Sequence, residues 1–157
     1  MKFSIVLMAA ALLSALPAKA NDLMGVAEII DGKTLKIAGA RVQLFGIDAP
    51  ALKQTCARPQ QGPQKIIPCG KLAKWALMDL VIGAKVICTW KIKKRRLAIC
   101  KAGGFDLARN IVHTGWALAD REQSMRYVIT ENEAKAAKRG LWIGTFTPPQ
   151  QWRAENK

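Results

Sequence analysis

The chain has 157 residues and carries 25 Lys and Arg against 11 Asp and Glu, which gives a formal net charge of +14. This excess of positive charge favours polyanionic partners, namely nucleic acid, anionic lipid or acidic polysaccharide, without choosing among them. After residue 20 no stretch is long and apolar enough to predict a transmembrane helix, and no repeat or low-complexity linker divides the chain, so one domain is expected.

Residues 1–20 are typical of a secretory signal peptide. Lys2 precedes an apolar run over residues 3–16, and Ala18-Lys19-Ala20 matches a cleavage site. The apolar run is too short to span a bilayer; a buried N-terminal helix is the alternative. Cleavage near Ala20 leaves residues 21–157 with 23 basic and 11 acidic residues, a formal charge of +12. We therefore expect a periplasmic or secreted protein.

Three β-strands are predicted first in the exported part, where apolar residues alternate with polar ones. They cover Val26–Ile30, Thr34–Ile37 and Val42–Phe45. Asp31 and Gly32 form a pair that can supply the positive φ angles of a two-residue hairpin.

The rest of the chain alternates between helical periodicity and short β-like runs. Gly70–Ile82 is predicted as an amphipathic helix with Leu72, Ala76 and Leu80 on one face, Trp75 beside them and Gly83 as its stop. The elements expected after it are strands Lys85–Trp90 and Arg95–Lys101, helices Asp106–Thr114 and Arg121–Arg139, and an irregular tail, Leu141–Arg153. Five strands with a helix before the fourth fit an α+β fold with a small OB-type barrel.

Four cysteines lie in the exported part, where oxidising conditions favour disulfides: Cys56, Cys69, Cys88 and Cys100. Three pairings are possible. We favour Cys56–Cys69, which closes a loop rich in Pro, Gln and Gly, and Cys88–Cys100, which joins two neighbouring antiparallel strands. A zinc site of four thiolates is the alternative, although none of the spacings is the C-x2-C typical of such sites.

The stretch 26–51 resembles the core of the staphylococcal nuclease-like (thermonuclease) family. The family pattern D-G-D-T is matched by residues 31–34, and V-R-L-x-G-I-D-A-P-E by residues 42–51. Further landmarks of exported bacterial members follow in order: Cys56, Cys69, Gly70, Arg95, Leu97, Ala98, Cys100, Gly115, Trp116, Ala117, Arg139 to Trp142, Pro149, Trp152 and Arg153. The resemblance implies a five-stranded OB-type β-barrel with three helices over residues 21–157.

In active members of that family two aspartates hold calcium, a glutamate acts on the attacking water and two arginines neutralise the phosphate. By resemblance, Asp48 is the second of these aspartates, Arg95 is the second arginine, and Asp31 is at best an outer ligand. Three positions depart from the pattern. They are Lys33 for a calcium-binding aspartate, Gln43 for the first arginine and Ala51 for the glutamate.

These departures predict loss of calcium-dependent nuclease activity and no bound cofactor. Ca²⁺ takes six to eight oxygen ligands, which Asp31 and Asp48 cannot supply beside a repelling lysine. The alternative is a weak or metal-altered phosphodiesterase, with Ca²⁺, that uses Asp48, Arg95 and Asp31. We further hypothesise that the Lys33 ammonium replaces the metal as the counter-ion of Asp48; the alternative is that Lys33 points into water.

A basic hairpin is the most visible charged feature. It places five cations in six residues beside Trp90: Lys91, Lys93, Lys94, Arg95 and Arg96. On an OB-type barrel such hairpins bind single-stranded nucleic acid by phosphate contacts and base stacking, whereas the alternative is a solvated hairpin that protects a strand edge. We therefore predict binding of a polyanion, either single-stranded nucleic acid or acidic polysaccharide. An envelope module that binds another protein, linked to the exopolysaccharide production of some relatives, is a further alternative.

The remaining polar and aromatic residues are interpreted as structural. His113 is expected to end a helix rather than to catalyse a reaction. Glu122 and Glu131 are expected to be exposed on the third helix as partners of Arg126 and Lys135. Four tryptophans are interpreted as packing residues: Trp75, Trp116, Trp142 and Trp152.

Overall fold

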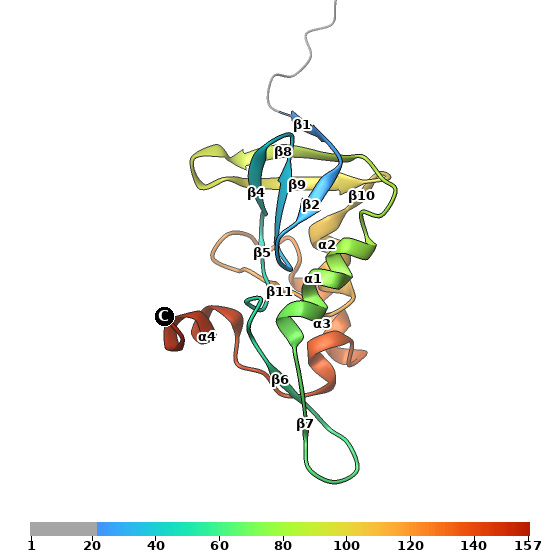
Figure 1. The fold of residues 1–157 in the computed structure, drawn as a ribbon, viewed down its shortest axis with the longest axis vertical. Coiled ribbons are helices and arrows are strands. Elements are labelled where there is room, and N and C mark those ends of the chain that lie inside the picture. Colours follow the sequence, from blue (N-terminus) through green and yellow to red (C-terminus); the bar gives the residue numbers. More distant parts are fainter. Residues whose placement is uncertain (1–21) are drawn as a thin grey trace, which may run out of the picture.

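The computed structural model describes residues 22–157 (Figure 1). The predicted signal peptide, residues 1–20 with its cleavage site near Ala20, lies outside these residues. In Figure 1 the sheet occupies the upper half of the molecule, helices α1 to α3 lie below it, and α4 with the C-terminus lies to the left. Among residues 22–157 no helix has the length and apolar character needed to cross a membrane.

The sheet forms a five-stranded barrel because its first strand bends. β1 (Asp22–Gly25) pairs with β8, and β2 (Ala27–Ile29), which continues it after Val26, pairs with β3. One bent strand thus occupies both ends of the order β1-β8-β9-β4-β3-β2, which closes the barrel. The other barrel strands are β3 (Thr34–Ile37), β4 (Ala40–Leu44), β8 (Val86–Ile92) and β9 (Leu97–Ala102). β4 runs parallel to β9 and the other pairs are antiparallel. The predicted OB-type barrel is confirmed.

Short strands and helices complete the fold. The strands are β5 (Ile47–Asp48), β6 (Cys56–Arg58), β7 (Lys65–Ile67), β10 (Phe105–Asp106) and β11 (Leu118–Ala119). The helices are α1 (Cys69–Asp79), α2 (Leu107–His113), α3 (Val128–Ala136) and α4 (Pro149–Glu155), with 3-10 segments η1 (Lys93–Arg95) and η2 (Gly140–Ile143). Asp106 caps α2 by accepting the Arg109 N–H at 3.1 Å, which satisfies one of the free N–H groups of the first turn.

Both predicted disulfides, Cys56–Cys69 and Cys88–Cys100, are present, and residues 22–157 contain no free cysteine. The second bridge joins directly opposed residues of β8 and β9. The zinc-site alternative is therefore wrong. The main core lies between the barrel and α2, where Leu35, Val42 and Ile111 are fully buried.

The expectation that Asp31 and Gly32 form a hairpin turn with positive φ is corrected. The turn with positive φ is formed by Ala38 and Gly39 (48° and 78°) between β3 and β4, and Gly32 does not have a positive φ. Gly32 is needed for space instead, because a Cβ there would lie 2.8 Å from the Ala73 Cβ and 3.0 Å from the Ala49 Cβ. α1 therefore packs directly on this loop.

The third helix is shorter than predicted because Asp120 organises the residues before it. Its Oδ1 accepts the N–H groups of Glu122 and Gln123 at 3.1 and 3.3 Å, which holds that segment in a turn rather than a helix. Glu131 is buried, not exposed, and accepts hydrogen bonds from the Ala119 N–H at 3.0 Å and from Arg121 at 2.5 Å. The expected exposed pairs with Arg126 and Lys135 are wrong.

The end of α1, the exposure of Trp75 and the structure of the tail also differ from the sequence-based expectation. α1 ends at Asp79, and its buried face is formed by Cys69, Gly70, Ala73 and Leu77. Trp75 is 52% exposed, so its interpretation as a packing residue is wrong. The tail expected to be irregular contains η2 and α4, and α4 starts with Pro149 at a position where proline suits a helix.

Candidate functional site

Asp48 lies at the centre of the candidate site because a two-stranded ladder buries it. β5 pairs with β11, and Leu118 is opposite Asp48. The Asp48 side chain is 12% exposed, and its Oδ1 accepts the N–H of Ala49 at 3.1 Å. A carboxylate in this position requires compensation of its charge by neighbouring groups.

Two cations from distant parts of the chain provide that compensation. Lys33 Nζ lies 2.6 Å from Asp48 Oδ1, and the Arg153 guanidinium lies 2.7 Å from Asp48 Oδ2. Burial by itself would raise the pKa of Asp48, but the hydrogen bond from Arg153, with the charge and hydrogen bond of Lys33, outweighs it and lowers the pKa below the usual value. The hypothesis that Lys33 pairs with Asp48 is confirmed, and Asp48 is held as a carboxylate.

Lys33 reaches Asp48 because its backbone is fixed on both sides. The Lys33 N–H donates to Asp31 Oδ1 at 3.0 Å, and its carbonyl accepts the Leu44 N–H at 2.8 Å. Asp31, predicted at best as an outer metal ligand, thus holds the loop between β2 and β3. Lys33 stands where the family pattern has the other calcium-binding aspartate, and its ammonium contacts Asp48.

Arg153 is the residue of the site that the sequence did not assign. Its position depends on two anchors of the segment before α4. Gln54 is fully buried and its Nε2 donates to the Thr147 carbonyl at 2.7 Å. Ala57 and Thr145 exchange two backbone hydrogen bonds, each 2.9 Å long. These contacts bring α4 to Asp48. Arg153 therefore joins the site although it is more than one hundred residues from Asp48 in sequence.

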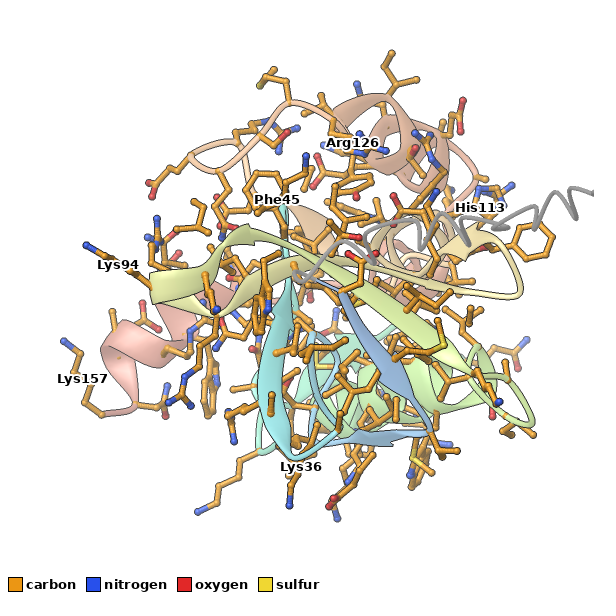
Figure 2. The ribbon with its side chains drawn as sticks, turned by 90° about the horizontal axis from the view of Figure 1, so that it is seen from above. Lys36, Phe45, Lys94, His113, Arg126 and Lys157 are labelled. Atoms are coloured by element: carbon orange, nitrogen blue, oxygen red, sulfur yellow. A yellow bond between two sulfur atoms is a disulfide. The ribbon has the colours of Figure 1, made fainter. Side chains whose placement is uncertain are left out.

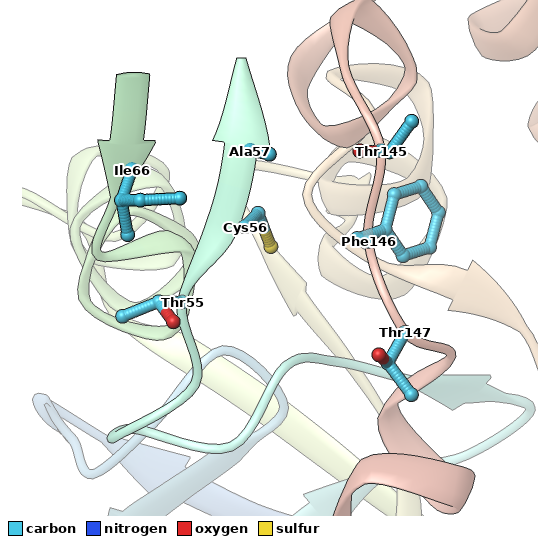
Figure 3. A pocket seen from close by; sticks show the side chains of 7 residues that line it. All are labelled: Thr55, Cys56, Ala57, Ile66, Thr145, Phe146 and Thr147. Atoms are coloured by element: carbon cyan, nitrogen blue, oxygen red, sulfur yellow. The ribbon is translucent and has the colours of Figure 1, made fainter. Parts of the chain in front are cut away.

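A pocket of about 330 Å³ lies between β6 and this C-terminal segment (Figure 3). Figure 3 shows Thr145, Phe146 and Thr147 along one side, opposite Thr55, Cys56 and Ala57. Its lining residues carry no charge. We therefore interpret it as part of the junction that positions α4.

The other positions of the family pattern do not complete a catalytic site around Asp48. Gln43 donates its backbone N–H to the Arg96 carbonyl at 2.8 Å. The Ala51 carbonyl lies against α1, where a Cβ on Gly70 would be only 1.8 Å from it. Arg95 is exposed in η1 and, among residues 22–157, forms no ion pair with Asp48.

The residues around Asp48 do not fit the calcium ion that the resemblance implies. Both carboxylate oxygens already accept hydrogen bonds from cations, and a metal with charge +2 would be repelled by them. Among residues 22–157, no group of three His, Cys, Asp or Glu side chains is arranged to hold a metal ion.

Three of the six predicted polyanion-binding residues line a second feature, which we call the hairpin pocket. It has a volume of about 310 Å³ and is lined by Gly39, Ala40, Arg41, Trp90, Lys93 and Arg96. The structure thus brings Trp90, Lys93 and Arg96 together and adds Arg41. Figure 2 shows Lys94 at the end of the β8–β9 ribbon, pointing away from the body of the protein. Lys91, Lys94 and Arg95 are exposed and lie outside the pocket lining.

His113 ends α2, as predicted, and is exposed. An Arg139 guanidinium nitrogen lies 3.2 Å from its Nε2 and donates to its carbonyl at 3.3 Å. This contact ties α2 to the segment before η2, which agrees with a structural role.

Comparison with known proteins gives two similarities. A family model described as staphylococcal nuclease homologue matches residues 41–144. The succinoglycan biosynthesis protein ExoI of Rhizobium meliloti (strain 1021) is 30% identical over 129 residues, which cover 78% of this chain and 66% of the relative. The chain thus spans just under two-thirds of the length of that relative.

Proposed function

The chain belongs to the staphylococcal nuclease homologue family, and on this basis we propose that it is an exported polyanion-binding protein without calcium-dependent nuclease activity. One observation carries the proposal: Lys33 and Arg153 occupy both oxygens of Asp48. In this arrangement the carboxylate balances the protein's own cations, so it neither binds a metal nor acts as a base. The function requires no cofactor.

The ligand class is supported by charge. The exported part carries a formal charge of +12, and the five cations that follow Trp90 in the basic hairpin are all exposed. Single-stranded nucleic acid and acidic polysaccharide both present repeated negative charges to such a surface. The two disulfides suit an oxidising compartment outside the cytoplasm, which agrees with export.

The name of the relative favours acidic polysaccharide over single-stranded nucleic acid as the ligand. Since that relative is named for succinoglycan biosynthesis, we propose a role for this protein in the production or handling of an extracellular polysaccharide. A protein partner in the envelope is the second candidate.

The first experiment measures hydrolysis of single-stranded DNA by residues 21–157, with calcium and then with a chelator. The control is a variant that combines Lys33→Ala, Asp48→Ala and Arg95→Ala. We expect no cleavage above that control. Calcium-dependent cleavage by the natural sequence alone would reject the proposal and support a nuclease that uses Asp48, Arg95 and Asp31.

The second experiment measures binding of polyanions as a function of salt. For single-stranded nucleic acid the logarithm of the affinity should fall with a slope of about −0.7 per phosphate contacted. Replacing Lys93, Lys94 and Arg96 by alanine should reduce both the affinity and the slope. The matched control replaces three exposed lysines elsewhere, Lys53, Lys71 and Lys138. Equal effects of the two triple variants would remove the hairpin from the proposal.

A further inference from the structure

The hairpin pocket combines cations from two separate hairpins. Arg41 comes from the β3–β4 hairpin, and Trp90, Lys93 and Arg96 come from the β8–β9 hairpin. We propose that this pocket is a subsite for one acid-bearing sugar unit of an anionic polysaccharide. The inference rests on the polyanion-binding function proposed above and names its ligand class.

Backbone hydrogen bonds connect the two hairpins that carry the arginines of the pocket. Arg96 donates its N–H to the Lys93 carbonyl at 3.0 Å, and its own carbonyl accepts the Gln43 N–H at 2.8 Å. Gln43 lies on β4 two residues after Arg41, so this hydrogen bond fixes the distance between the two hairpins. The backbone positions from which the two arginine side chains extend are thereby fixed before a ligand arrives, which reduces the entropic cost of binding.

Arg96 also has a left-handed backbone conformation, with φ of 56°. Glycine adopts this conformation without strain, whereas a residue with a Cβ does so at a cost. This conformation ends η1 and sets the direction in which the Arg96 side chain leaves the β8–β9 hairpin, where it lines the pocket.

The lining of the pocket suits an acidic group. Arg41, Lys93 and Arg96 are cationic, and none of the six lining residues has an acidic, amide or hydroxyl side chain. Guanidinium groups bind carboxylates through paired hydrogen bonds. The set can therefore recognise a carboxylate, and its side chains offer no acceptor for the amino groups of adenine or cytosine.

The aromatic content of the pocket favours a single ring. Trp90 is partly buried against the core and also lines the pocket. Proteins that bind single-stranded nucleic acid usually stack successive bases on several aromatic side chains. Among the described residues, the strongly exposed aromatic side chains are Trp75 on α1 and Phe105 on β10, and neither lines this pocket. A volume of about 310 Å³ lies at the lower end of the range for ligand pockets, which agrees with one sugar ring.

The test is calorimetric titration at one fixed, low ionic strength with three probes. The first is an oligogalacturonate, whose sugar units carry carboxylates. The second is the same oligosaccharide with its carboxyl groups reduced to alcohols. The third is an oligothymidylate with the same number of negative charges. Each is titrated into residues 21–157 and into the variants Arg41→Ala, Arg41→Lys and, as control, Lys138→Ala, after equal thermal stability has been established.

We expect the oligogalacturonate to bind more tightly than the other two probes. Arg41→Ala should weaken it about tenfold or more and Arg41→Lys by less, because lysine keeps the charge without the paired hydrogen bonds. Lys138→Ala should change the affinity less than about twofold.

Each other outcome overturns part of the inference. Equal binding of the reduced oligosaccharide would exclude recognition of an acidic group. Tighter binding of the oligothymidylate would reject the sugar and leave the polyanion-binding function intact. Equal effects of Arg41→Ala and Lys138→Ala would place the ligand outside the pocket. If none of the three probes binds, the polyanion-binding function itself is rejected.

Discussion

Lys33 and Asp48 form an ion pair 2.6 Å long between a surface loop and a buried strand. In the family pattern the position of Lys33 belongs to an acidic residue that shares a metal with Asp48. In this chain the same position places a covalently attached positive charge beside Asp48, and Arg153 adds a second cation. A site built in this way keeps the local fold of the nuclease family, while its central carboxylate is paired with two side-chain cations.

The Lys33–Asp48 pair should contribute to stability at neutral pH. Asp48→Asn leaves two cations without their counter-charge and should reduce the free energy of unfolding by about 3 kcal/mol. Lys33→Met should cost less, about 1–2 kcal/mol, because Arg153 still pairs with Asp48. Urea unfolding at pH 7 measures both changes. Lys36→Met, at an exposed position of the neighbouring strand, is the control; equal values for Lys33→Met and Lys36→Met would contradict the assignment.

The contribution of Asp48 should depend on pH in the acidic range only. Its pKa in the folded protein is lowered, relative to about 3.9 for an unfolded chain. The stabilisation is therefore fully present above about pH 4 and is lost as the pH falls through the folded-state pKa. The difference in unfolding free energy between the natural sequence and Asp48→Asn should be constant from pH 6 to 8 and decrease below about pH 4. A difference that decreases between pH 8 and 6 would point to another group.

Arg153 should oppose reconstruction of a calcium site. Combining Lys33→Asp, Gln43→Arg and Ala51→Glu restores the family pattern, but Arg153 still bonds Asp48 Oδ2 at 2.7 Å. We expect this triple variant to gain little thermal stability from millimolar Ca²⁺, and a quadruple variant with Arg153→Gln to gain more, because binding to the folded state stabilises it. The natural sequence should show no calcium-dependent shift. An equal shift in the triple and quadruple variants would show that Arg153 does not compete with the metal.

Gly32 and Gly39 should respond to alanine for different reasons. Gly32→Ala places a methyl group 2.8 Å from the Ala73 Cβ, and such overpacking should cost about 1–3 kcal/mol. Gly39→Ala meets no atom within 4 Å but keeps a φ of 78°, which should cost about 1 kcal/mol. Thermal unfolding measures both. Ala73→Gly should rescue the first variant and leave the second unchanged; rescue of both, or of neither, would reject the close contact as the cause.

Each disulfide should stabilise the fold by restricting the unfolded chain. The bridged residues are 13 and 12 positions apart, and loops of this length correspond to about 3 kcal/mol in the chain-entropy model. Replacing Cys56 and Cys69 by alanine should also loosen the segment that holds α4, because Ala57 bonds Thr145. Hydrogen exchange at Ala57 and Thr145 should then increase. In the variant that lacks Cys88 and Cys100, exchange at these two positions should increase only as much as the loss of global stability requires.

Local patterns in the sequence predicted most of the barrel. Alternating apolar residues located β3 and β4 and the pairing of β8 with β9. The composition of the loop after Cys56 and the predicted pairing of two strands favoured the two disulfides that are present. The departures arose where side chains compete with helix formation or where space is limiting. Asp120 captures backbone N–H groups and delays α3, and Gly32 is required by α1 rather than by its own backbone angle. The second effect has no signature over a few residues, because Ala73 is far from Gly32 in sequence.

The sequence by itself determined that the family's metal and base positions are changed, because Lys33, Gln43 and Ala51 stand at fixed places in a recognisable motif. It also determined a strongly basic surface, since charge is a property of composition. Only the tertiary structure decided that Arg153 reaches Asp48 and that Arg41 joins Trp90, Lys93 and Arg96 in one pocket. The reason is that both arrangements depend on the path of the folded chain, through Gln54 and Thr145 in one case and the Gln43–Arg96 hydrogen bond in the other. Contacts between residues so far apart in sequence leave no periodicity or spacing from which they could be read.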